Sequence, residues 1–467
     1  MDVQSDALVN PLLILALSVG VVVLAVGVLR LHPFFSLLLS AAVVAVLSAK
    51  GSDSLRFVKA IDGVMAEAGV VMGRLGFTIA MAAVIGMCLL ESGAADRIIR
   101  RLIAVFGERR ASVALLLGAF VIAGPVFVDT VMMLLLPLAR ALSLRTGRHY
   151  LLNVLVVCAG ASLANGVIPP APGPLFVAEA LRLPLGIAMI AGVVFCIIPL
   201  AAALVTARWF DGRITVPVRP VPGSTLDSLR LIAARPESEL PPLWLSVCPV
   251  LVPLLLISIA SFAALAHKTW SPVIETAMET LGNKNVALAI GGVIAVIMYA
   301  RQKDVTGRDA ARILGRPLET AGVIILIVSA GGAYGAMIKN AGVGDAVKAL
   351  ATGHSINYVV LAWLLAALIR AAQGSATVAT IAASGIMLSI AGADGFGVHP
   401  LYIFLAIGFG AKFLAWMNDA GFWVVCRMGG LTQEETLRSW TPTVSIVSIV
   451  GLIEVWVVSS LWPRLPL

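Results

Sequence analysis

In the second half of the chain, a cluster of polar residues interrupts a long apolar stretch. Within the run 359–390, the segment Ile369–Ile381 carries an arginine, a glutamine and several hydroxyl residues around a glycine. In a bilayer, irregular polar backbone is tolerated only where protein or a water-filled cavity covers it, and polar side chains there are usually functional. We interpret this segment as the tip of a re-entrant helical hairpin that holds a solute. Its candidate binding residues are Arg370, Gln373, Gly374, Ser375 and Thr377.

Arg370 places a positive charge at this predicted tip. Backbone amides at the start of the returning helix would point towards the solute, and helix N-termini favour anions. A guanidinium group can add a charge-assisted hydrogen bond, so the pattern favours a carboxylate ligand. The alternative is that Arg370 extends its charged end outwards to the membrane surface.

A second apolar run, 112–142, is interrupted at Gly124–Thr130 and predicts another hairpin. Its tip contains Asp129, an acid in an otherwise apolar sequence. Because burial penalises the charged form of a carboxylate, an acid at this depth is suited to carrying a proton. We predict that Asp129 and Thr130 contact the solute and that Asp129 carries the proton. The alternative is that Asp129 caps a helix after a turn at Pro125.

Prolines interrupt a third run at 162–174, which reads SLANGVIPPAPGP. The prolines cannot continue a helix, and the backbone groups that they free need partners, which a solute can supply. The alternative is a kinked helix without a solute. The candidate contacts are Ser162, Asn165, Pro172 and Gly173, and Glu179 in the next half-helix is a further candidate for proton coupling.

The fourth interruption, Trp416–Trp423, places Asn418 and Asp419 in an apolar span. Adjacent polar side chains are costly in such a span, so we predict both as solute contacts and Asp419 as a second proton carrier. Lys412 lies earlier in the chain, about two turns away on roughly the same helix face. A structural Lys412–Asp419 ion pair is the alternative.

These interruptions lie in a strongly apolar chain. Of its 467 residues, 60% are hydrophobic and 12% are charged, against roughly 25% charged in soluble proteins. This composition indicates an all-α polytopic membrane protein in contact with lipid. The net charge of +8 comes from basic residues clustered in short loops, which indicates cytoplasmic loops and not a nucleic-acid partner.

The remaining residues predict neither a metal nor a cofactor. The five cysteines show no metal-ligand spacing, and the five histidines are scattered singly. The sequence lacks a GxxxxGK[ST] phosphate-binding motif, which argues against ATP-driven pumping. The acidic N-terminus lacks the basic region of a cleavable signal peptide, so the first span is expected to remain.

Apolar runs of about 20 residues, the length that crosses a bilayer, predict about ten spans besides the two hairpins. The expected spans are 10–29, 32–49, 77–90, 151–180, 185–210, 244–265, 286–300, 320–338, 400–426 and 443–461. Two of them, 151–180 and 400–426, are expected to be broken helices. When both long runs are treated as hairpins, most basic residues fall in loops on one side of the membrane. Such loops are usually cytoplasmic, so both termini are expected on the outer side of the inner (cytoplasmic) membrane.

The chain divides into two similar halves. A Gly–x–x–Asp pair opens an amphipathic helix at Gly93 and Asp96, and again at Gly342 and Asp345. Inverted repeats with paired broken helices indicate a secondary transporter whose site lies near the membrane midplane. The expected units are a first repeat, 1–210, with hairpin 112–142; a cytoplasmic linker, 211–242; and a second, inverted repeat, 243–467, with hairpin 359–390.

Several motifs, in order along 76–461, resemble those of the gluconate permease family (GntP-type). They are VIPPAPGP, AGGAYGAMIKNAGVGDAV, AQGSATVA, and NDAGFW followed by LTQEETLRSWT. The resemblance implies proton-coupled uptake of gluconate or a related sugar or hydroxy acid, and the family also includes a D-serine permease. It further implies a homodimer with an outer scaffold and a moving transport domain. It supports the same positions: Asp129, Thr130, Asn165, Pro169–Pro174, Gln373–Thr377, Asn418 and Asp419.

Together with the resemblance, these patterns predict a proton-coupled symporter for a small carboxylate and not an enzyme. Gluconate is the first candidate for the substrate. Sodium-coupled symport is an alternative, in which freed carbonyl groups and the Asn165 and Asn418 side chains bind the cation. A membrane enzyme that uses the buried acids is a second alternative, but the sequence offers no plausible nucleophile–base pair. A passive channel is a third, and accumulation of solute against a gradient would exclude it.

Overall fold

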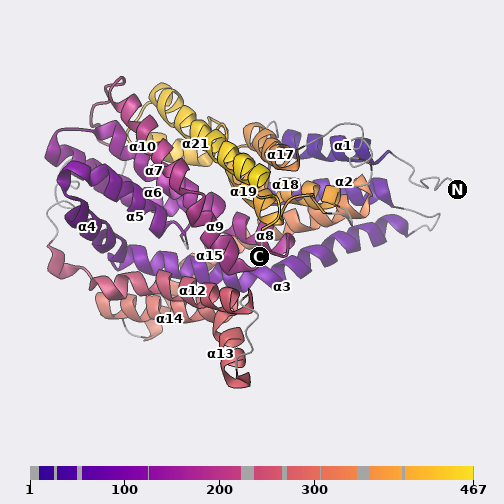
Figure 1. Ribbon diagram of the computed structural model, residues 1–467, viewed down its shortest axis with the longest axis horizontal. Coiled ribbons are helices and arrows are strands. Elements are labelled where there is room, and N and C mark those ends of the chain that lie inside the picture. Colours follow the sequence, from indigo (N-terminus) through magenta and orange to yellow (C-terminus); the bar gives the residue numbers. More distant parts are fainter. Residues whose placement is uncertain are drawn as a thin grey trace.

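The computed structural model describes residues 10–25, 29–49, 55–124, 126–221, 236–265, 271–305, 307–343, 346, 357–391 and 395–465. Throughout these ranges the chain forms helices joined by turns and short loops, without a β-strand (Figure 1). The structure therefore confirms the all-α prediction.

Seven helical stretches in the described residues are long and apolar enough to cross a membrane. They are Arg56–Glu91, Tyr150–Ala180, Leu185–Asp211, Leu243–Ala264, Lys284–Lys303, Leu314–Asn340 and Gln433–Leu461. The other three expected spans contain shorter apolar helices, Pro11–Val23, Pro33–Ser48 and Pro400–Gly410.

Some helix boundaries differ from the prediction. The helix expected at 77–90 already begins at Arg56, and the one expected at 320–338 begins at Gly307. Once a helix is nucleated, each added residue contributes a backbone hydrogen bond, so the helix continues through polar residues that hydropathy assigns to a loop.

The first half contains α1 (Pro11–Val23), α2 (Pro33–Ser48), α3 (Arg56–Glu91), α4 (Ala94–Phe106), α5 (Ala111–Ile122), α6 (Val128–Thr146), α7 (Tyr150–Val167), α8 (Pro172–Ala180), α9 (Leu185–Val194) and α10 (Ile197–Asp211). Gly93, with φ of +84°, turns the chain into the amphipathic α4, as predicted. A short turn joins α5 to α6 where the first hairpin is expected. The proline-rich break separates α7 from α8, and its Pro169–Pro170 peptide bond is cis.

The second half contains α12 (Leu243–Leu265), α13 (Pro272–Gly282), α14 (Lys284–Lys303), α15 (Gly307–Asn340), α17 (Tyr358–Gln373), α18 (Ala376–Ala391), α19 (Pro400–Gly410), α20 (Ala420–Met428) and α21 (Gln433–Leu461). Gly342 has a positive φ of +70°, similar to that of Gly93 in the first half. Asp345 lies outside the described residues. A helix pair, an interrupted helix and further helical segments thus follow one another in both halves. The inverted relation of the halves stays a prediction.

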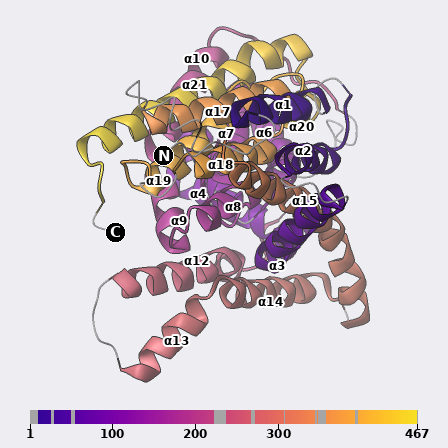
Figure 2. The ribbon, with the colours of Figure 1, turned by 90° about the vertical axis from the view of Figure 1, so that its right-hand side faces the viewer.

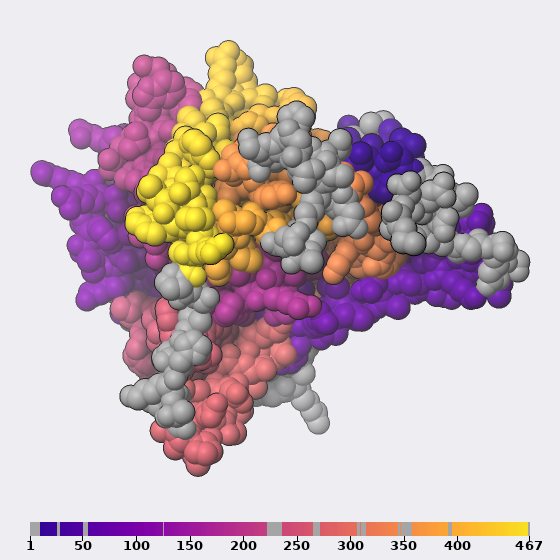
Figure 3. Space-filling view, turned by 45° about the vertical axis from the view of Figure 1, so that its right-hand side comes forward, coloured from indigo at the N-terminus to yellow at the C-terminus, as the bar shows by residue number. Residues whose placement is uncertain are grey.

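The two interrupted helices form the centre of the molecule. Every residue of α7 except Asn165 is buried, and so is every residue of α19 except Pro400. Helices α5, α6 and α10 pack against α7, and α17 and α21 pack against α19. Long helices α3 and α15 lie side by side (Figure 1), and α12, α13 and α14 form a layer on one side of the body (Figure 2). Figure 3 shows this layer projecting from the rest of the molecule.

Two arginines bind the start of the predicted linker to this body. Residues 222–235 of the linker lie outside the described residues. Arg219 donates to both carboxylate oxygens of Glu435 on α21, at 2.6 and 2.8 Å. Arg140 is fully buried on α6. Its Nη2 donates to the carbonyl oxygen of Arg219 at 2.5 Å, so the linker holds α6 and α21 together.

Helices α15 and α18 meet backbone to backbone at two glycines. A Cβ atom added to Gly385 would lie 2.6 Å from the Cα of Gly335, closer than side-chain carbons are found in proteins. Gly385 therefore has no room for a side chain, and a Cβ on Gly335 would lie 3.0 Å from the Cα of Gly385, so the close crossing depends mainly on Gly385.

We expect Gly385→Ala to lower the free energy of unfolding by about 1–3 kcal/mol, because the added methyl group must push the two helices apart. Thermal unfolding in detergent measures this loss. Gly322→Ala on α15 is the matched control, since a Cβ there meets no atom within 4 Å. Equal melting temperatures for the two variants would show that the crossing is not tightly packed.

Candidate functional site

The tip of the second helix pair is built by Gly374 and Ser375, between α17 and α18. Gly374 has φ of +85°, a left-handed conformation that ends α17 and that glycine adopts most easily. The Ser375 hydroxyl accepts a hydrogen bond from the amide of Val378 at 3.4 Å and so caps α18. A Cβ on Gly374 would lie 2.1 Å from the Asn418 carbonyl oxygen, so this tip touches the second interrupted helix directly.

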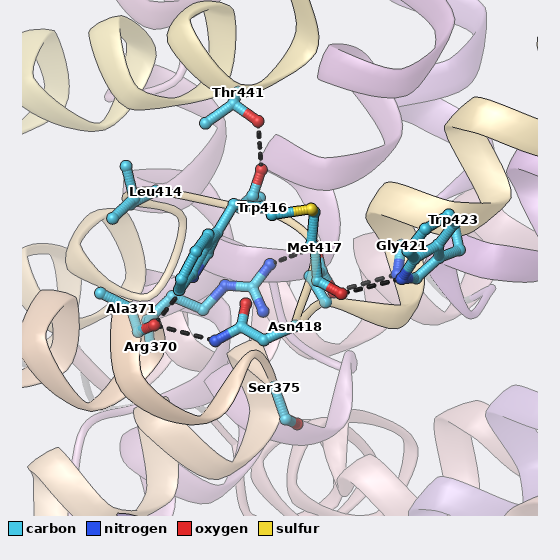
Figure 4. A network of polar contacts seen from close by, with 12 residues as sticks. Arg370, Ala371, Ser375, Leu414, Trp416, Met417, Asn418, Gly421, Trp423 and Thr441 are labelled. Atoms are coloured by element: carbon cyan, nitrogen blue, oxygen red, sulfur yellow. Dashed lines mark hydrogen bonds and ion pairs between the residues drawn. The ribbon is translucent and has the colours of Figure 1, made fainter. Parts of the chain in front are cut away.

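The irregular segment 411–419 between α19 and α20 is held by side chains. The Trp416 Nε1 and the Asn418 Nδ2 both donate to the Ala371 carbonyl oxygen, at 2.9 and 2.8 Å (Figure 4). The Thr441 hydroxyl donates to the Ala415 carbonyl oxygen at 2.7 Å. The predicted ligand Asn418 therefore docks the segment onto α17, and its side chain is exposed.

Arg370 and Asp419 form a buried ion pair beneath this segment. The Nη2 of Arg370 donates to Oδ2 of Asp419 at 2.5 Å, and the two side chains are 5% and 11% exposed. The other oxygen of Asp419 accepts from the Gly421 amide and caps α20. Two alternatives are therefore wrong: Arg370 does not extend to the membrane surface, and Asp419 pairs with Arg370 instead of Lys412.

Asp129 and Lys412 complete a charged cluster around this pair. Each lies close enough to interact electrostatically with the other and with both Arg370 and Asp419. Lys412 is 4% exposed and Asp129 is half-buried in the first turn of α6. The helix cap of α6 is Phe127, so the alternative of Asp129 as the cap is also wrong. Three segments that are far apart in the sequence, α6, α17 and 411–419, thus bring two acids and two bases together.

Several polar atoms in this region have no hydrogen-bond partner in the described part of the chain. They are Nε and Nη1 of Arg370 and Oε1 of Gln373, all buried. A buried polar atom without a partner is costly, so a ligand that supplies one would be favoured. The two nitrogens suit a carboxylate, and the glutamine oxygen suits a hydroxyl or ammonium donor.

The proline-rich break lies against the second helix pair. A Cβ on Gly173 would touch the Thr380 side chain at 3.4 Å, which places the start of α8, with Pro172, beside α18. Thr377 lies half-buried one turn before Thr380 on α18. On α7, Ser162 is buried and Asn165 is half-buried.

The structure separates two predicted residues from the charged cluster. Thr130 lines a different cavity, between α3 and α15. Glu179 forms an ion pair with Lys284 of α14, at the opposite end of α8 from the proline-rich break. Their predicted roles in solute contact and coupling stay predictions.

Two features of the site were missed in the sequence. Gly166 makes room for Lys412, because a Cβ there would lie 1.9 Å from the Cε of the lysine. Glu454 on α21 has a buried Oε2 without a partner among the described residues, and Cys196 lies within electrostatic range of both Glu454 and Lys412. An acid inside a predicted apolar span was the signal that could have identified Glu454.

Paired helices, interrupted helices and charges enclosed among them define a polytopic membrane transport protein. Residues 10–461 match the family described as GntP family permease, and the chain belongs to this family. It is 31% identical to a gluconate permease of Pseudomonas aeruginosa, over 94% of this chain and 95% of that protein. It is 30% identical to the Gnt-II system L-idonate transporter of Escherichia coli, over 96% of this chain and 99% of that protein.

The fold also resembles that of a solved structure. The Alcanivorax borkumensis YdaH transporter superposes with a TM-score of 0.63 at 14% identity, over 92% of this chain and 99% of that chain. At this level of identity the likeness supports the fold alone.

We expect Arg370→Gln to lower the free energy of unfolding by about 3–5 kcal/mol, because it leaves the Asp419 carboxylate buried without its partner. The double variant Arg370→Gln/Asp419→Asn removes both charges and should recover much of this loss. Thermal unfolding of the three proteins in detergent tests the pair. A double variant no more stable than Arg370→Gln would argue against a direct interaction.

Proposed function

We propose that this chain is a proton-coupled symporter that carries gluconate or a related small hydroxy acid into the cell. The observation that carries the proposal is the buried Arg370, which has two nitrogens without hydrogen-bond partners among the described residues. A carboxylate is a strong ligand for a guanidinium, and either free nitrogen can donate a charge-assisted hydrogen bond to it while Nη2 stays on Asp419. The relatives named gluconate permease and L-idonate transporter support a sugar acid as the substrate.

The charges of the cluster support coupling to a cation. Counted as ionised, Asp129 and Asp419 balance Arg370 and Lys412. A bound carboxylate would add one uncompensated negative charge in a region of low dielectric, which is costly. A proton on either acid would restore neutrality and favour joint binding. We propose this balance as the origin of one-to-one coupling; a sodium ion is the alternative cation.

The remaining polar groups suit the rest of a hydroxy acid. Oε1 of Gln373 would accept a hydrogen bond from a substrate hydroxyl, and the first amides of α18 would face the carboxylate end. An ammonium group would satisfy the same glutamine oxygen. D-serine is therefore the alternative substrate to a sugar acid.

We also propose how the molecule moves. Helices α1–α3 and α12–α15 would form a scaffold that binds a second copy of the chain, and α5–α10 with α17–α21 would form the body that carries the solute. The packing of these last helices around α7 and α19 supports a single moving body. In this proposal the two paired helices are re-entrant, the halves are inverted, and both termini lie outside the inner membrane.

The test is uptake of radiolabelled gluconate into proteoliposomes with an inward proton gradient, with and without sodium. We expect uphill uptake that needs no sodium. Asp129→Asn should reduce it by about tenfold or more, the equivalent of 1.4 kcal/mol, because the variant cannot exchange a proton at this position. Asp62→Asn, at an exposed position of α3, is the matched control and should transport normally.

Three outcomes would change the proposal. Uptake that requires sodium would replace the proton with sodium as the coupling ion. Uphill uptake of D-serine in proteoliposomes that take up no gluconate would change the substrate. Normal uphill uptake by Asp129→Asn would move proton coupling to Asp419 or to another acid.

Gly166→Ala tests whether Lys412 must lie in the cluster. The added methyl group would overlap the Cε of Lys412 and displace its ammonium group. We expect gluconate uptake to fall by about tenfold, with little change in melting temperature because a flexible side chain can move. Gly20→Ala, which adds a methyl group in open space on α1, should leave uptake unchanged. Equal uptake by both variants would contradict a role for Lys412.

A further inference from the structure

A cavity lies beside the tip of the first helix pair. Its volume is about 210 Å³, and it is enclosed by α3, α15 and the tip that joins α5 to α6. The polar residues among its walls are Thr130 from the tip, Glu91 from α3, and Arg316 and Thr320 from α15. The volume is below the roughly 300–1,000 Å³ of sites for drug-sized ligands, which suits a smaller solute.

One acid and one base, Glu91 and Arg316, line this cavity. The Tyr299 hydroxyl donates to the Glu91 carboxylate at 3.1 Å, so this acid already has a partner. Arg316 is exposed at the cavity and forms no ion pair with another described residue. The cavity therefore offers a guanidinium group that is available to a ligand.

The tip separates this cavity from the charged cluster. Asp129 and Thr130 are consecutive, yet Asp129 interacts with Arg370 and Lys412 whereas Thr130 lines the cavity. The tip also packs closely on α3: a Cβ on Gly86 would lie 3.2 Å from a methyl group of Val126.

We propose that this cavity is a vestibule that binds the carried anion next to the charged cluster. Arg316 holds the carboxylate of a small organic acid through charge-assisted hydrogen bonds, and the Thr130 hydroxyl contacts its polar body. The vestibule serves one face of the membrane only, the face at which α14 ends and α15 begins. This inference rests on the proposed function, because it assumes that the chain carries a small organic acid.

The first experiment measures uptake from each face of the membrane separately, in proteoliposomes of known orientation. Arg316→Gln should raise the KM for gluconate about tenfold from the face of the α14–α15 connection, the effect of losing a hydrogen bond to a charged group. The KM from the opposite face should not change, and kcat from that face should fall by the same factor, because kcat/KM for the two directions stays equal when no gradient is imposed. Arg301→Gln, an exposed arginine in the last turn of α14, is the matched control and should leave both KM values unchanged.

A second experiment does not require transport. In the Thr130→Cys variant, a negatively charged thiol reagent should label the new cysteine faster than a positively charged reagent of similar size. Adding Arg316→Gln should abolish this preference. The wild-type chain, with its native cysteines, gives the background; Cys88 on the neighbouring α3 is buried.

The two readouts separate the possible failures. An equal rise in KM from both faces, no rise at all, or labelling without a preference for the anionic reagent would each overturn the vestibule. Anion preference at residue 130 in a chain that carries no gluconate would keep the anion site and overturn the proposed substrate instead.

Discussion

The centre of this structure depends on the buried ion pair between Arg370 and Asp419. Removing both charges from water costs several kcal/mol for each ion, and the attraction offsets this cost only when the geometry is held. The two residues are 49 positions apart and belong to different helices. Asp419 also caps α20, so one carboxylate fixes both the start of a helix and the orientation of the arginine. A ligand that competes for Arg370 therefore acts on the second helix pair and the second interrupted helix at once.

Interrupted helices inside a membrane must satisfy the backbone groups that they free. In the segment 411–419, Thr441 and Trp423 donate to the carbonyl oxygens of Ala415 and Met417. Trp416 and Asn418 instead attach the segment to the Ala371 carbonyl oxygen of α17. Polar residues at a break thus serve two purposes. Some, such as Asn418, stabilise the irregular backbone, and others, such as Arg370, keep hydrogen-bonding atoms free. Residue type alone does not distinguish the two.

The sequence predicted where the helices are interrupted, because proline, glycine and polar clusters stand out against an apolar background. It could not predict which interruptions meet. The partner of Asp419 is Arg370 and not Lys412, which is nearer in the sequence. The partner of Glu179 is Lys284, which lies far away in the sequence on α14. Asp129 and Thr130 are neighbours in the chain, yet Asp129 belongs to the charged cluster and Thr130 lines a cavity between α3 and α15. These pairings arise from tertiary packing, which composition and periodicity do not reveal.

The contact between Gly335 and Gly385 has a mechanical consequence. Helices usually meet through ridges of side chains that fit into grooves, and such an interface resists sliding because each ridge must climb over the next. At this crossing the two backbones face each other without side chains between them. One turn away, the Ile381 side chain of α18 fills the space that Gly331 leaves on α15. A shift of α18 along α15 must therefore displace this side chain, so the interface holds the two helices at one relative position along their axes.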